Sequence, residues 1–350
     1  MTGVQELLDK TISSDASDLH LNPGRPPVGR VKGHLVALAP ETLDDAATEA
    51  LCRELCDEKH WQEIQTVGST DFGIAHQSGD RFRASVFRQR GRYSAVLRLI
   101  PSRLLTFEEI GLPEAVQELL RRPRGLVLVT GPTGSGKTTT LATMLDWINQ
   151  NQDRHIITIE DPIEYFHSHG KGLVTQREVG TDVPDFPEAM RRALRQDPDV
   201  ILLGEMRDLE TISAAITAAE TGHLVFGTLH TTGSARTVNR IIDAFPANQQ
   251  EQIRAQLSVS LIGVISQALL PRKDGTGRIA AFEVMLMTPA IGNLIRKNET
   301  NKIQSTIQTS RRLGMVTLDD YLLDLVRRDL ITADVAFDAA QDPKDLEARL

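Results

Sequence analysis

The stretch Gly131-Pro132-Thr133-Gly134-Ser135-Gly136-Lys137-Thr138 decides the fold of this chain of 350 residues. It fits the phosphate-loop pattern G-x-x-x-x-G-K-[ST], in which backbone N–H groups curl around phosphate oxygens. The apolar run before it, residues 125–130 (GLVLVT), predicts a buried parallel strand, and residues 137–149 predict a helix. A helix N-terminus attracts anions, so strand, loop and helix together predict a nucleotide site rather than a glycine-rich turn with a solvated lysine.

The loop pattern assigns roles to its side chains. We expect Lys137 to reach the β- and γ-phosphates and the hydroxyl of Thr138 to bind Mg²⁺, so the implied cofactors are ATP and Mg²⁺. The expected nucleotide-binding residues are Gly131, Pro132, Thr133, Gly134, Ser135, Gly136, Lys137, Thr138 and Thr139.

The composition limits which classes of protein this chain can belong to. The net charge of −8 argues against a dedicated nucleic-acid binder, and the 40% apolar content is enough for a large core. Cys52 and Cys56 have no second cysteine pair, so free thiols in a reducing cytosol are favoured over a zinc site. No signal pattern opens the chain, and the longest apolar-rich stretch, residues 257–270, is too short and polar to span a bilayer. We therefore expect a soluble cytoplasmic protein, peripheral at most to a membrane.

The sequence falls into regions that differ in composition and in the pattern of their apolar residues. Residues 1–99 predict a small α+β domain, with helices over 4–11 and 44–56, strands over 17–21, 71–76, 81–89 and 93–100, and a hairpin over 28–38 that turns at Lys32-Gly33. Residues 100–113 are an expected linker. From residue 114 strands alternate with helices, which predicts an α/β domain with a parallel sheet covered on both faces, and from about residue 288 the chain is expected to be helical.

Acidic residues follow two of the predicted strands. Residues 199–205 (DVILLGE) end in Glu205, where phosphate-loop proteins usually place an Asp that binds Mg²⁺, so we expect Glu205 to hold the ion directly or through a water. After residues 156–161 (IITIED), Glu164 is the expected base for the attacking water, with Glu160 or Asp161 as alternatives. Caps, turns or a solvated strand end are the simpler roles for these carboxylates.

Two histidines frame a third predicted strand, residues 224–230 (LVFGTLH). His223 precedes it and His230 ends it, and we expect both at the edge that carries the acidic strand ends. A histidine there donates a hydrogen bond to the γ-phosphate and responds to its presence. Each histidine taken alone would be structural.

Four sequence blocks carry a resemblance. GPTGSGKT, TIEDPIEY, ILLGEMRD and TGHLVFGTLHTT resemble the Walker A, Asp box, Walker B and His box segments of the secretion ATPase superfamily, and most closely its PilT-type branch, the type IV pilus retraction ATPases of twitching motility. The resemblance implies a RecA-like core, a PAS-like N-terminal domain and a homo-hexameric ring with ATP between domains of adjoining subunits. It further implies an ATP-hydrolysing motor that acts on an inner-membrane platform protein of the PilC type, at the inner face of the cytoplasmic membrane.

Other branches stay open. The chain lacks the long N-terminal extension and the four-cysteine motif of assembly ATPases, but residues 288–297 (TPAIGNLIRK) depart from the retraction motif AIRNLIRE at Gly292 and Lys297. A PilU-type accessory retraction ATPase, or another motor of the superfamily for pilus or pseudopilus assembly or DNA uptake, is the alternative. PilU- or PilB-type paralogues are then implied partners, whereas no specific nucleic acid is expected. A nucleic-acid translocase and a regulator without turnover are the competing classes.

Arginines of the first domain complete the expected site. The segments R-F-R and L-R-L-I-P resemble those from which the family supplies arginines to the nucleotide, which points to Arg81, Arg83 and Arg98. Because Arg81 and Arg83 alternate with Phe82, we expect both to project from one face while Phe82 enters the core. The simpler alternative is a solvated basic strand face.

Overall fold

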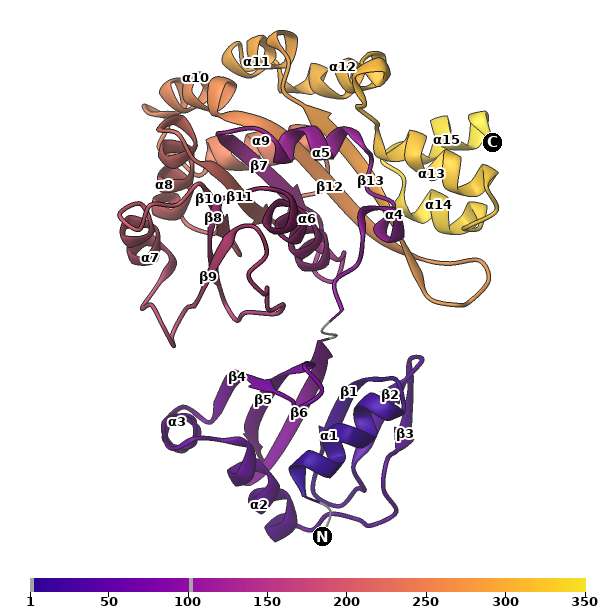
Figure 1. Cartoon of the computed structure of the whole chain (residues 1–350). Helices are drawn as coiled ribbons and strands as arrows, with labels where there is room; N and C mark the ends of the chain where they lie inside the picture. Colours follow the sequence, from indigo (N-terminus) through magenta and orange to yellow (C-terminus); the bar gives the residue numbers. More distant parts are fainter. Residues whose placement is uncertain (1–2, 101–102) are drawn as a thin grey trace. The chain divides into compact units, whose positions relative to one another are not determined.

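The computed structural model describes residues 3–100 and 103–350, which form two compact units (Figure 1). The first unit holds residues 1–103 together with Pro162–Phe166, and the second holds Leu104–Asp161 and His167–Leu350. Residues 101–102 of the expected linker lie outside the described residues.

The first unit is built on one antiparallel sheet with the strand order β3-β2-β1-β6-β5-β4. Its strands are β1 (Ala16–Leu21), β2 (Val28–Val31), β3 (His34–Ala37), β4 (Ser69–Ala75), β5 (Arg81–Gln89) and β6 (Arg92–Ile100). The hairpin of β2 and β3 turns at Lys32 (φ 48°) and Gly33 (φ 88°), as a type I′ turn requires, at the position expected from the sequence.

Three helices cover the core of the first unit: α1 (Val4–Ser13), α2 (Asp45–Leu55) and α3 (Glu58–Val67). Buried side chains of all three pack with alternate residues of β5 and β6, including Phe82, which is fully buried as expected. The helix α3 is not among the elements predicted from the sequence. Asp57 caps it by accepting a hydrogen bond from His60 N at 2.8 Å, and Ile64 is its one fully buried residue.

The second unit is built on a mixed sheet with the order β13-β12-β7-β11-β10-β8-β9. Its strands are β7 (Gly125–Thr130), β8 (His155–Glu160), β9 (Leu173–Glu178), β10 (Val200–Leu203), β11 (Leu224–Leu229), β12 (Leu261–Pro271) and β13 (Arg278–Leu286). All neighbouring strands run parallel except β12 and β13, which form a long antiparallel hairpin. The expectation of a wholly parallel sheet is therefore wrong at this edge.

Helices lie on both faces of this sheet (Figure 1). Leu126 and Leu128 of β7 point to one buried layer, and Val127 and Val129 point to the other. The helices of the first layer are α7 (Phe186–Ala193), α8 (Leu209–Glu220), α9 (Ser234–Asp243), α10 (Gln250–Ser260), α11 (Pro289–Arg296) and α12 (Ile303–Thr309). The second layer holds α4 (Phe107–Ile110), α5 (Ala115–Leu120) and α6 (Lys137–Asn151).

The chain ends in three helices, α13 (Leu318–Arg327), α14 (Ala333–Ala339) and α15 (Pro343–Arg349). Their apolar residues form a separate buried cluster with Leu270 of β12 and Ala281 of β13. α13 is the amphipathic packing helix that its sequence predicts, with Leu322 and Leu325 buried. Among the described residues, no helix combines the length and the apolar character needed to span a bilayer.

Candidate functional site

The phosphate loop lies between β7 and α6, and its glycines adopt backbone angles that other residues avoid. Gly131 has φ 146° and Gly136 has φ 88°. A Cβ at Gly131 would lie 2.2 Å from Gln267 O, and a Cβ at Gly136 would lie 2.9 Å from Gln267 Nε2. The loop therefore depends on glycine both for its backbone conformation and for its close approach to β12.

The residues at the loop fit a phosphate group. Lys137 Nζ donates to Gly131 O at 2.8 Å and to Pro132 O at 3.1 Å, so the ammonium group is held at the loop. Ser135 Oγ is buried and has no hydrogen-bond partner among the described residues. The loop leads directly into α6, a helix of 15 residues whose N-terminus attracts anions, with Thr138 and Thr139 half-buried in its first turn. Thr138 thus stands where a Mg²⁺ ligand is expected.

Glu205 and His230 come together at the carboxyl ends of β10 and β11. Glu205 Oε1 accepts from Arg207 Nε at 2.5 Å and lies 2.9 Å from His230 Nε2. Partial burial by itself raises the pKa of Glu205, but the hydrogen bonds and charges of Arg207 and His230 outweigh it and leave the pKa below its ordinary value. The pKa of Arg207 is raised, chiefly through its hydrogen bond to Glu205. Glu205 therefore stays ionised, as a ligand for a cation must.

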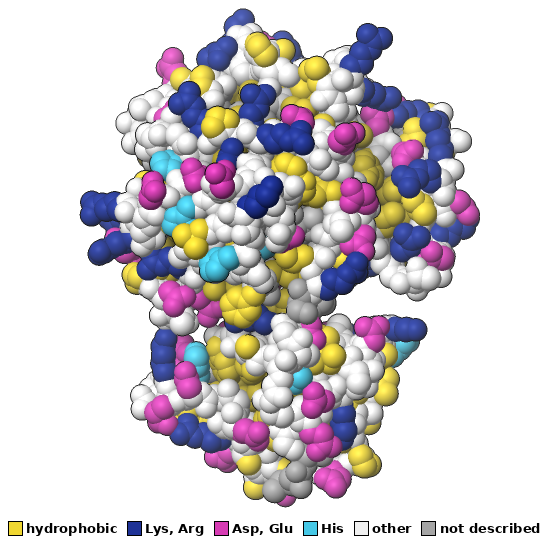
Figure 2. Space-filling view, in the orientation of Figure 1, with side chains coloured by type: hydrophobic (Ala, Val, Ile, Leu, Met, Phe, Trp, Pro, Cys, Tyr) yellow, Lys and Arg dark blue, Asp and Glu magenta, His cyan; other side chains and the backbone are white. Residues whose placement is uncertain are grey.

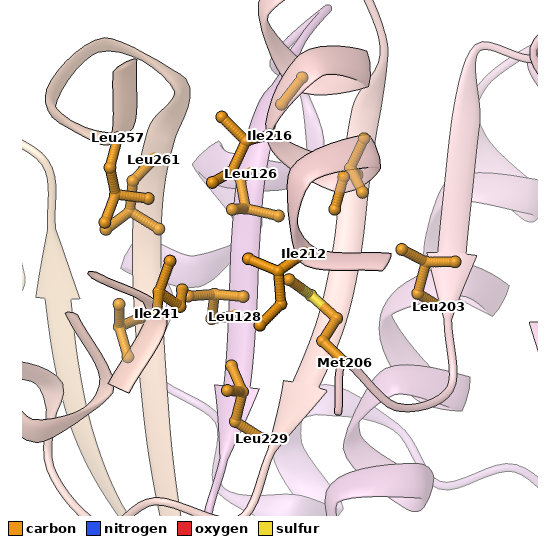
Figure 3. Close-up of a cluster of buried hydrophobic side chains, with 14 of the residues drawn as sticks. Leu126, Leu128, Leu203, Met206, Ile212, Ile216, Leu229, Ile241, Leu257 and Leu261 are labelled. Atoms are coloured by element: carbon orange, nitrogen blue, oxygen red, sulfur yellow. The ribbon is translucent and has the colours of Figure 1, made fainter. Parts of the chain in front are cut away.

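The segment that carries Glu205 is anchored in the core. Met206 is 2% exposed and reaches toward Ile212 (Figure 3). Gly227 of β11 leaves room for it, since a Cβ there would lie 2.2 Å from Met206 Sδ. Met206 N also donates to Thr228 O at 3.0 Å. The two strand ends that carry Glu205 and His230 are therefore fixed to each other.

The two alternative bases differ in how they are held. Glu160 is buried and accepts hydrogen bonds from Thr158 Oγ1 at 2.6 Å and Gln176 Nε2 at 3.3 Å. Asp161 is exposed and adds to the electrostatic field around Arg207. Glu160 is therefore a well-satisfied buried carboxyl group, whereas Asp161 is accessible at the same edge as Glu205.

The expectation for His223 is wrong. His223 stands before β11, and His230 stands after it, so the two histidines lie at opposite ends of one strand. His223 O accepts from Gly125 N at 3.0 Å at the start of β7, and His223 Nδ1 lies 3.0 Å from Ala218 O. His223 therefore belongs to the amino edge of the sheet, away from the phosphate loop that follows β7.

The remaining expected residues, Glu164 and the three arginines, lie in the first unit. Glu164 is half-buried in the segment Pro162–Phe166. Arg81 is buried, donates from Nη1 to Ile163 O at 3.1 Å and places its guanidinium 3.8 Å from the centre of the Phe166 ring. Arg81 is thus buried against the segment Pro162–Phe166, which is contrary to the simpler alternative of a solvated strand face for this residue.

Arg83 and Arg98 lie opposite each other on β5 and β6, and Arg98 lies opposite Asp18 of β1. Arg98 Nε donates to Asp18 Oδ1 at 2.9 Å. Burial works to raise the pKa of Asp18, but hydrogen bonds from Ser17 and Arg98 bring it below its ordinary value. Arg83 is exposed and has no ionic partner among the described residues. In this row of three charged residues Asp18 compensates Arg98, and Arg83 is left uncompensated beside a like charge.

Buried polar residues of the β12–β13 hairpin, which were not predicted from the sequence, hold the first turn of α6 and the start of α9. Gln267 Oε1 accepts from Thr140 Oγ1 at 2.7 Å, and Ser266 Oγ accepts from Gly233 N at 2.8 Å. Glu283 Oε1 accepts from both N and Oγ of Ser234 at 2.7 Å. The available signal was the polar residues inside otherwise apolar strand sequence, which are costly to bury without partners.

The departures at Gly292 and Lys297 fall on α11 and its C-cap. Gly292 is buried against α10, where a Cβ would lie 3.2 Å from Ser258 O. Arg296 Nη1 donates to Ser258 Oγ at 3.1 Å, and Lys297 is exposed. An arginine side chain at position 292 would not fit between α10 and α11 without moving these two helices apart.

Comparisons with known proteins agree on one family. The model of the family described as type II/IV secretion system protein matches residues 3–325. The chain is 49% identical over 342 residues to the type IV pilus retraction ATPase PilT of Pseudomonas aeruginosa, covering 98% of this chain and 99% of the relative. It is 39% identical to the type IV pilus ATPase PilU of the same organism, over 98% of this chain and 90% of that relative. A crystal structure of the pilus retraction motor PilT with bound ADP superposes with a TM-score of 0.93 at 48% identity, covering 99% of this chain and 100% of that one.

Proposed function

The chain belongs to the type II/IV secretion system protein family, and we propose that it is an ATP-driven motor that retracts type IV pili. The observation that carries the proposal is the 49% identity to a retraction ATPase over almost the whole of both chains. The geometry supports ATP hydrolysis, because the carboxyl edge of one sheet carries the phosphate loop with Lys137 and the Glu205–His230 pair.

Each group of the second unit has a distinct task in hydrolysis. Lys137 moves from the loop carbonyls to the β- and γ-phosphates when ATP binds. Thr138, and Glu205 directly or through a water, would hold Mg²⁺, which when bound would neutralise phosphate charge. His230, already within hydrogen-bond distance of Glu205, reports the presence of the γ-phosphate to the helix α9 that follows it.

The first unit supplies the remaining chemistry in this proposal. Glu164 orients and deprotonates the attacking water, and Arg81, Arg83 and Arg98 stabilise the charge that spreads over the γ-phosphate oxygens. Arg83 is suited to this task because it lacks an ionic partner among the described residues, and Arg98 would have to exchange Asp18 for phosphate. A homo-hexameric ring, in which units of adjoining subunits meet at the nucleotide, provides the setting.

The proposed partner is a platform protein of the PilC type at the inner face of the cytoplasmic membrane, with PilU- or PilB-type motors as further partners. A PilU-type accessory role is the second candidate, kept open by the departures at Gly292 and Lys297 but disfavoured by the lower identity of 39%. A nucleic-acid translocase is disfavoured because basic and acidic side chains intermingle over the face in Figure 2, without a continuous basic stripe.

Two experiments test the proposal. Lys137→Ala should abolish both nucleotide binding and turnover, whereas Glu164→Gln should bind ATP and hydrolyse it at least about 10²-fold slower, the usual size of a general-base effect. A deletion strain lacking its retraction ATPase, complemented with this gene, should regain twitching. Full ATPase activity without any recovery of twitching would place the chain in another branch of the family.

A further inference from the structure

A buried glutamate contacts the start of the helix that follows the loop carrying His230. Glu283 of β13 is fully buried and stands opposite Ser266 in the β12–β13 hairpin. Its Oε1 accepts from N and Oγ of Ser234 at 2.7 Å each, and its Oε2 accepts from Gln341 Nε2 at 3.0 Å. Donors on both oxygens offset the cost of burying this group.

Ser234 is the first residue of α9, which begins directly after the segment 230–233. Glu283 therefore binds the N-terminus of the helix, where negative charge is favoured. Gly233 N donates to Ser266 Oγ at 2.8 Å, and a Cβ at Gly233 would lie 3.1 Å from Gln341 Nε2. The loop after β11 is thus held from one side by the hairpin and by Gln341.

Gln341 in turn belongs to the C-terminal helices, between α14 and α15. Its backbone N donates to Asp319 Oδ1 at 2.7 Å, and Asp342 N donates to Asp319 Oδ2 at 3.0 Å. Asp319 lies in α13, which packs in the C-terminal apolar cluster. A continuous chain of hydrogen bonds therefore runs from α13 through Gln341 and Glu283 to the start of α9.

We propose that Glu283 and Gln341 are positioning residues through which the C-terminal helices hold His230 against Glu205. The inference rests on the proposed function, and it assigns the C-terminal helices a part in the rate of ATP hydrolysis. Neither residue belongs to the phosphate loop, and β12 separates β13 from β7 in the sheet. Loss of the contact should therefore lower kcat while nucleotide affinity is retained.

The variants can be matched closely in size. Gln341→Glu sets two carboxyl groups against each other and breaks the contact without removing volume. The double variant Glu283→Gln/Gln341→Glu restores one amide–carboxylate hydrogen bond with donor and acceptor exchanged, while the new amide oxygen still accepts from Ser234. Gln256→Glu is the control, since Gln256 Nε2 donates to Glu220 Oε2 at 3.1 Å between α10 and α8, outside the site.

Three readouts decide the proposal, all on the full-length chain. For Gln341→Glu we expect kcat to fall about tenfold, the size of one partly buried hydrogen bond to a charged group expressed in the rate. The Kd of a fluorescent ADP analogue should stay within about twofold. Amide exchange of residues 230–237 in the nucleotide-free chain should quicken about tenfold by the same reasoning. The double variant should recover both kcat and exchange, and Gln256→Glu should change neither.

Several results would overturn the proposal: an unchanged kcat in Gln341→Glu, an equal loss in Gln256→Glu, or no recovery in the double variant. If Gln341→Glu does not fold, Gln341→Ala repeats the test without the added charge, with a loss of at least about threefold expected. The exchange measurement needs no ATP, so it separates failure of this inference from failure of the proposed function, which Lys137→Ala tests.

Discussion

The hydrogen bond between Thr140 and Gln267 attaches the first turn of α6 to β12, and a double-mutant cycle measures what it contributes. The two side chains are 1% and 5% exposed, and Thr140 Oγ1 donates to Gln267 Oε1 at 2.7 Å. Thr140→Val leaves the amide oxygen without its donor, and Gln267→Met leaves the hydroxyl without its acceptor. Each single variant should lower the free energy of unfolding by about 1–3 kcal/mol, because a buried polar group loses its partner.

The double variant should lose clearly less free energy of unfolding than the two single variants lose together. Both partners are then apolar and of nearly the original shape, a change that is often close to neutral. We expect a coupling free energy of at least about 1 kcal/mol. Urea unfolding of the nucleotide-free chain measures it in a Trp61→Phe background, in which Trp147 of α6 is the remaining tryptophan and reports on the second unit.

The same cycle has a functional readout. Because Lys137 and Thr138 share the first turn of α6 with Thr140, each single variant should weaken ADP binding by up to about tenfold, equivalent to 1.4 kcal/mol. The double variant should recover part of the lost affinity. If the losses of unfolding free energy in the two single variants sum to the loss in the double variant within about 0.5 kcal/mol, the two side chains do not act as a pair and the prediction is wrong.

Further predictions follow from the site. Gly131→Ala should abolish nucleotide binding in a fluorescence assay, since its Cβ would meet Gln267 O at 2.2 Å. Glu205→Gln should lower the free energy of unfolding at pH 7 by no more than about 1 kcal/mol, because the group is partly exposed. The pKa of Glu205 is lowered by folding, so this difference should shrink as pH falls below 4.5, which unfolding curves at several pH values would reveal. His223→Ala should retain most of the ATPase activity, in contrast to His230→Ala. Arg83→Ala should lower kcat more than ADP affinity, and equal losses would remove it from the site.

Much of the fold was predictable because its signals are local. The strands β7, β8, β10 and β11 are short apolar runs with turn residues at their ends, and each lies within a residue or two of its predicted bounds. The phosphate loop was predictable for the same reason, since the spacing of its glycines is a local pattern that indicates phosphate binding. The helix α3 was missed because its sequence, EKHWQEIQTV, is mostly polar and contains one fully buried residue.

The β12–β13 hairpin was missed because no glycine or proline marks the change from helix to strand. α10 ends at Ser260 and β12 begins at Leu261, inside one apolar-rich stretch. The error at His223 has a different cause. A strand of 6 residues separates its ends by about 20 Å, so two residues that frame it cannot both lie at the carboxyl edge.

The antiparallel hairpin at this edge of the sheet carries the buried polar residues that support the site. Ser266 pairs with both Thr130 of β7 and Glu283 of β13, so all three lie at one level, where the phosphate loop begins. Elsewhere the two hairpin strands are mostly apolar, and at this level the first turn of α6 and the segment after β11 bring hydrogen-bond donors. Polar side chains are affordable in a core only where such partners exist. Because β13 runs back from this level toward α11, a single hairpin supports both segments and connects them to the helices that end the chain.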